Sequence, residues 1–107
     1  MSIRLITSAF AVATLYGSYM VLAQDIGNIG RGHQIAQTIC SACHQVSKGE
    51  RGSPNSEAPP FPLLAAVPGM TSIALTAALQ TSHRRMPNVV LEPDQRRDVV
   101  AYILSLK

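Results

Sequence analysis

The residues of this chain that can do chemistry are concentrated in five consecutive positions, 40–44. Cys40 and Cys43 are its only cysteines, two residues separate them, and His44 follows at once. This Cys-x-x-Cys-His pattern predicts covalent attachment of one haem, because two thiols at this spacing can bond the two vinyl groups of haem. The imidazole that follows then suits an axial position on the iron.

Two other interpretations of the same pattern are weaker. A thioredoxin-like redox pair also has two cysteines at this spacing, but it lies where a strand meets a helix, and no strand pattern precedes Cys40. A structural zinc site needs four ligands, and His33 and His83 are the only further histidines that could complete one. Haem attachment therefore remains the favoured hypothesis.

Three residues outside the motif are candidates for the sixth iron position. Met86 precedes Pro87 between two predicted helices, where a loop can present the sulfur on the side opposite His44. Met70 is interpreted as core filler, the usual role of methionine. His83 is an isolated histidine in a polar segment, which favours simple solvation. We predict Met86 as the ligand, with His83 and Met70 as alternatives.

Three predicted helices and one long loop must position these residues. Residues 28–40 place small and apolar side chains at three- and four-residue spacings and end at the cysteines. Residues 71–81 contain no helix breaker, and residues 93–107 begin with Pro-Asp, a favourable helix start. Residues 47–62, rich in Gly, Pro and Ser, predict a loop long enough to wrap a ligand.

The three- and four-residue spacing of apolar side chains also predicts which helix residues are buried and which are solvated. The predicted buried face of the last helix consists of Val99, Val100, Ile103, Leu104 and Leu106. Its predicted solvated face carries Arg96, Arg97 and Asp98. His33 is expected at the surface of the first helix. Arg84 and Arg85 are also interpreted as solvated, with a docking or propionate-binding role left open.

Residues 1–23 are predicted to be a secretory signal that is removed. Arg4 supplies a positive charge, an apolar stretch follows to Leu22, and Ala23 ends a sequence that signal peptidase tolerates. An uncleaved membrane anchor is the alternative, since about 18 apolar residues approach the length of a membrane span. We therefore expect a mature domain of residues 24–107 in the periplasm, with membrane anchoring only if the signal is retained.

The composition of residues 24–107 restricts the partners and the core. Eight Lys and Arg face six Asp and Glu, which is not the positive excess of a nucleic-acid-binding protein. Phe61 and Tyr102 are the only aromatic residues of this part, so side chains alone would give a thin core. Domains this small usually need a disulfide, a metal or a cofactor for stability, and a buried porphyrin would serve.

Beyond these local patterns, residues 30–107 resemble a class I c-type cytochrome of the short bacterial kind. Gly32 lies eight residues before the first cysteine, where the family has a glycine that lets its first and last helices cross closely. Tyr102 matches the aromatic residue of the facing helix, and Met86-Pro87 matches the axial methionine. The resemblance implies an all-α fold in which three to four short helices enclose one covalently bound haem c, with the N- and C-terminal helices crossing.

The resemblance also implies a second contact for the axial histidine. Residues 52–61 are similar to the family's loop over the histidine side of the haem. The carbonyl of Pro59, or else that of Pro60, would accept the hydrogen of His44 Nδ1. One position departs from the family, because Ala36 replaces an aromatic residue that many members have at the helix crossing. The crossing is therefore expected to be either closer or less well packed.

The implied function is one-electron transfer in the periplasm by haem c with His44 and Met86 as axial ligands. No acid, base or nucleophile constellation is visible, so we expect a carrier rather than an enzyme. Its partners would be redox proteins, namely a donor dehydrogenase or cytochrome complex and an acceptor oxidase or reductase. A haem c subunit within a periplasmic dehydrogenase complex is the alternative. An open haem that binds gases or peroxide would need a vacant sixth position, and Met86 argues against it.

Overall fold

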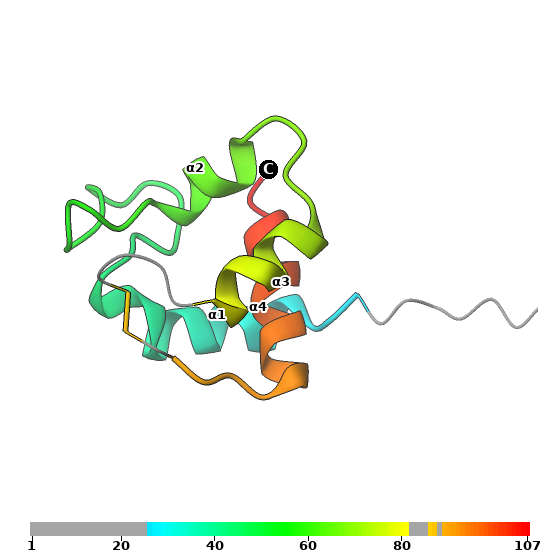
Figure 1. The fold of residues 1–107 in the computed structure, drawn as a ribbon. Helices are drawn as coiled ribbons and strands as arrows, with labels where there is room; N and C mark the ends of the chain where they lie inside the picture. Colours follow the sequence, from blue (N-terminus) through cyan, green and yellow to red (C-terminus); the bar gives the residue numbers. More distant parts are fainter. Residues whose placement is uncertain (1–25, 82–85, 88) are drawn as a thin grey trace, which may run out of the picture.

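The structure is a computed structural model that describes residues 26–81, 86–87 and 89–107. Along the chain lie α1 (Ile29–Thr38), a 3-10 turn η1 (Cys40–Ala42), α2 (Phe61–Ala66), α3 (Ser72–Gln80) and α4 (Pro93–Leu104) (Figure 1). All regular structure in these residues is helical, which confirms the predicted all-α class. The predicted signal, residues 1–23, lies outside the described residues, as do His83, Arg84 and Arg85.

The first and last helices, α1 and α4, pack across each other (Figure 1). Their backbones approach closely because Gly32 has no side chain. A Cβ atom on Gly32 would overlap the carbonyl oxygen of Asp98 and lie 2.8 Å from Tyr102 Cβ. Ala36, one turn further along α1, is completely buried in the core. The predicted crossing of the terminal helices is confirmed.

A ring contact is present at this crossing although Ala36 replaces the family's aromatic residue. The ring of His33 lies against that of Tyr102, with 4.9 Å between the centroids. The Tyr102 hydroxyl donates a hydrogen bond of 2.6 Å to the carbonyl oxygen of Val46. His33, predicted at the surface, is therefore half-buried there rather than fully solvated. The cause is the neighbouring Gly32, which brings α4 within reach of the imidazole.

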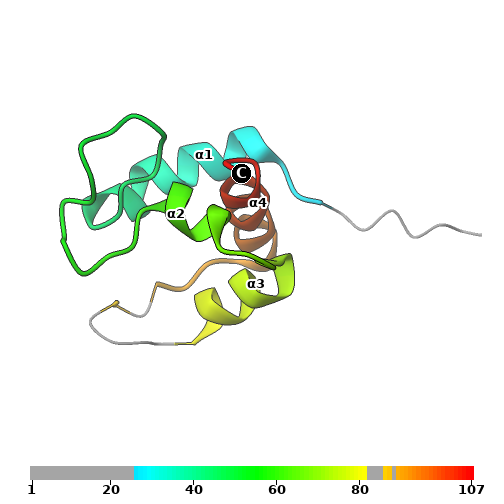
Figure 2. The ribbon, with the colours of Figure 1, turned by 90° about the horizontal axis from the view of Figure 1, so that it is seen from above.

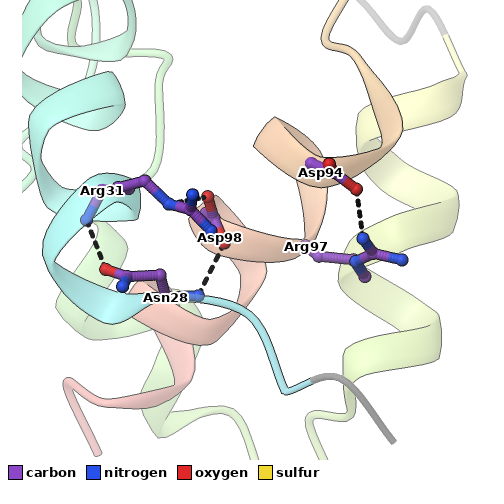
Figure 3. A network of polar contacts seen from close by, with 5 residues as sticks. All are labelled: Asn28, Arg31, Asp94, Arg97 and Asp98. Carbon is purple, nitrogen blue, oxygen red and sulfur yellow. Dashed lines mark hydrogen bonds and ion pairs between the residues drawn. The ribbon is translucent and has the colours of Figure 1, made fainter.

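Asp98 corrects a second prediction, because its side chain is only 5% exposed rather than solvated. Its carboxylate accepts a hydrogen bond of 2.6 Å from the backbone N–H of Asn28 and pairs with Arg31 Nε at 3.0 Å (Figure 3). Asn28 caps α1, since its side chain accepts from the backbone N–H of Arg31 at 2.9 Å. A carboxylate is favourable at the positive end of a helix, so Asp98 stabilises the start of α1 against α4.

We expect Asp98→Ala to lower the free energy of unfolding by about 1.5–3 kcal/mol, because it removes the charge-assisted hydrogen bond to the Asn28 N–H and the ion pair with Arg31. Asp94→Ala is the matched control, since Asp94 lies on the same helix and pairs with Arg97 at the surface (Figure 3). The control should lose less than about 1 kcal/mol. Urea unfolding of the haem-loaded protein, followed by far-UV circular dichroism, measures both. Equal losses would contradict a structural role for the Asp98 network.

Helices α2 and α3 complete the core against α4. Phe61 and Ala65 of α2 and Leu75 of α3 are buried. The short helix α2 was not predicted, because the loop was expected to continue to residue 62. Pro62 explains the difference, since proline suggests a loop in sequence yet fits the first turn of a helix, where its missing N–H is not needed. The predicted helices 71–81 and 93–107 correspond to α3 and α4.

Candidate functional site

A cavity of about 950 Å³ lies beside the Cys-x-x-Cys-His motif. This volume is at the upper end of the roughly 300–1,000 Å³ that is typical of cofactor and small-molecule sites. The elements η1, α2, α3 and α4 all contribute to its walls. The walls are largely apolar and include Ile39, Leu64, Leu75, Leu79, Leu91 and Ile103.

The motif forms one part of this wall because its backbone folds into a single tight turn. The N–H groups of Cys43 and His44 both donate to the carbonyl oxygen of Cys40, at 3.1 and 2.9 Å. The side chains of all three residues consequently line the same cavity. No disulfide joins the two cysteines. Burial raises the pKa of the Cys40 thiol above its usual value.

His44 is held by the loop that precedes α2. Its Nδ1 atom lies 2.8 Å from the carbonyl oxygen of Pro59. A carbonyl oxygen can only accept a hydrogen bond, so Nδ1 carries the proton, and Nε2 is the nitrogen left to coordinate a metal. Of the two prolines considered from sequence, Pro59 makes this contact. The carbonyl of Pro60 instead accepts from the N–H groups of Leu63 and Leu64, at 3.0 and 3.1 Å, in the first turn of α2.

The sequence did not predict the role of Phe61 at this site. Phe61 was assigned only to the loop over the histidine side and to the two aromatic residues of the core, yet its ring lies against the imidazole of His44 with 5.3 Å between centroids. The available signal was its position, because Phe61 follows Pro59 by two residues and a side chain there can reach the group that the Pro59 carbonyl binds.

Two methionines line the cavity, Met86 and Met70. Met86 is half-buried on the segment that leads into α4. Figure 2 shows the part of this segment that enters α4 on the α3 side of the molecule, away from α1. Met70 is also half-buried, and it packs against the hydrophobic core between α2 and α3. Its carbonyl oxygen accepts a hydrogen bond of 3.1 Å from Lys107 Nζ. The third candidate ligand, His83, lies outside the described residues.

The chemistry of these groups fits a haem. Two thiols on one turn, an imidazole with Nε2 available, a thioether and apolar walls match the covalent bonds, the iron ligands and the porphyrin of a c-type haem. The described part of the chain contains no group of three or more His, Cys, Asp or Glu that could hold a metal ion. No helix in that part is long and apolar enough to cross a membrane.

Comparison with known proteins adds one finding. A family model described as Cytochrome c matches residues 29–107, which include the motif, the cavity and all four α-helices. Searches among curated proteins and among solved structures found no match to this chain.

Proposed function

Because the chain belongs to the cytochrome c family and so carries covalently bound haem c, we propose that it is a periplasmic one-electron carrier with His44 and Met86 as axial ligands. Haem-based electron transfer follows from the family itself. The proposal adds the attachment of haem through Cys40 and Cys43, the identity of both ligands, and the location.

The observation that carries the proposal is that all four of these side chains line one apolar cavity. When bound, haem supplies the one-electron chemistry of its iron. The hydrogen bond from His44 Nδ1 to Pro59 orients the imidazole and increases the basicity of Nε2. His44 and Met86 would hold the iron in both oxidation states, so that neither side chain would have to move during electron transfer.

The proposed methionine ligand and the apolar cavity walls both support a positive reduction potential. A methionine sulfur favours the reduced state relative to a second histidine. The apolar walls formed by residues such as Leu75 and Ile103 exclude water, and low polarity disfavours the additional positive charge of the oxidised state. Both effects raise the reduction potential of the haem, as a carrier that accepts electrons from a dehydrogenase requires.

The test is the visible absorption spectrum of the purified, reduced protein before and after carbon monoxide. We expect a sharp c-type spectrum that the gas does not change, because the sixth position is filled. A spectrum that shifts on addition of the gas would contradict stable ligation by Met86. Haem staining after denaturing electrophoresis provides the control, since thioether-linked haem stays with the chain whether or not Met86 is a ligand.

A haem subunit of a larger dehydrogenase complex is the second candidate function. Residues 58–82 contain no charged residue, and among them Leu63 and Ile73 are 64% and 80% exposed. Apolar exposed residues are more typical of long-lived interfaces than of transient ones. Purification from native periplasm at high salt separates the candidates. A stoichiometric partner that stays bound would favour the subunit, and a free monomer would favour the carrier.

A further inference from the structure

Two residues of the segment 59–61 contact the side chain of His44, one through a hydrogen bond and one through its ring. The Pro59 carbonyl binds Nδ1, and the Phe61 ring packs on the imidazole at a tilt of 46°. The hydrogen bond alone does not fix the plane of the ring, since the His χ2 torsion has a broad minimum and carbonyl oxygens accept over a wide range of angles. A ring packed against the imidazole restricts the remaining rotation.

Phe61 is itself held firmly enough to act in this way. Its side chain belongs to the core and the residue is only 4% exposed. Its backbone N–H donates a hydrogen bond of 2.9 Å to the carbonyl oxygen of Gln45, the residue that follows His44. The backbone N–H of Gln45 in turn donates to Ser53 Oγ at 2.9 Å. The Phe61 ring is thus fixed relative to the backbone beside His44 as well as to its side chain.

We propose that Phe61 is a positioning residue that sets the rotation of the His44 imidazole about its Cβ–Cγ bond. Its centroid distance of 5.3 Å and tilt lie within the range of favourable aromatic pairs, which is roughly 4.5–7 Å between centroids. This inference rests on the proposed function, because it assigns to Phe61 an effect on an iron ligand. An aliphatic side chain at position 61 would fill the core but would not restrict the imidazole in the same way.

Electron paramagnetic resonance of the oxidised, haem-loaded protein tests the proposal, because the principal g values of low-spin ferric haem depend on the orientation of the imidazole plane. The variants are Phe61→Leu and Phe61→Ile, both of which keep an apolar aliphatic side chain and remove the ring. Val100→Ala is the matched control, since Val100 on α4 is as buried as Phe61 but is not among the residues that line the cavity. Two variants at position 61 allow for one of them failing to fold.

We expect shifted g values and broader lines in the Phe61 variants, and an unchanged spectrum in the Val100→Ala variant. Thermal unfolding of the three variants shows whether they lose similar stability, so that a general loosening of the core can be separated from an effect on His44. Unchanged g values in the Phe61 variants, or an equal shift in the control, would overturn the inference alone. A wild-type protein without a single low-spin signal would overturn the ligand assignment and the inference with it.

Discussion

Replacing Met86 by leucine is expected to open the sixth coordination position. The reduced variant should bind carbon monoxide, with a clear shift of its absorption maxima, because leucine offers no ligand atom. The midpoint potential should fall by on the order of 100 mV, since axial ligands account for much of a range of about 0.8 V among haem proteins. Absorption spectra with and without the gas, together with a redox titration, measure both changes.

The matched control is Met70→Leu. Met70 lines the same cavity and has the same chemistry, but it packs between α2 and α3 as part of the core. A leucine there should leave the gas response and the potential unchanged and cost less than about 1.5 kcal/mol in stability, because the two side chains have similar volumes. A gas response in the Met70 variant alone would identify Met70 as the ligand. If neither variant responds to the gas, His83 becomes the candidate for the sixth ligand.

Replacing Gly32 by alanine is expected to have the largest effect on folding. The added Cβ would overlap the Asp98 carbonyl oxygen, which belongs to the backbone of α4 and cannot rotate away. The two helices would have to separate, and the contact between His33 and Tyr102 would weaken with them. We expect a loss of about 3 kcal/mol or more, a large part of the roughly 5–15 kcal/mol that stabilises a small domain.

Gly30→Ala provides the control on the same helix. A Cβ on Gly30 would approach only Asn28 Oδ1, at 3.4 Å. Alanine has the higher helix propensity, so this variant should be unchanged or more stable by up to about 1 kcal/mol. Urea unfolding of the two haem-loaded variants measures the difference. A Gly32 variant as stable as the Gly30 variant would show that the helices do not depend on close backbone contact.

Much of the site could be predicted from local sequence because its chemistry is local. Cys40, Cys43 and His44 lie on one turn, so their spacing alone predicts that they face a common group, and the structure brings all three to one cavity. The last helix was also predictable, since Pro93 and the apolar residues after it mark its start and its buried face. Both features depend on residues within a few positions of one another.

The predictions that failed depended on partners far away in the chain. Asp98 was expected to be solvated because a carboxylate usually prefers water, and helical periodicity says nothing of what faces it. Its burial is favourable only because Asn28 and Arg31 meet it from a helix about 70 positions earlier. The contact between Phe61 and His44 was missed for the same reason, because it forms only when the loop of residues 45–60 brings Phe61 back beside His44.

The crossing of α1 and α4 also determines when the protein can fold. The hydrogen bond between Asn28 and Asp98 joins positions 70 residues apart, and Gly32 is buried only once α4 is in place. A chain still emerging from the ribosome without α4 cannot close this contact until residues 93–104 have been made. Contacts between distant positions also form slowly. Closure of α1 on α4 therefore follows the synthesis of residues 93–104 and cannot guide the folding of the segments made before them.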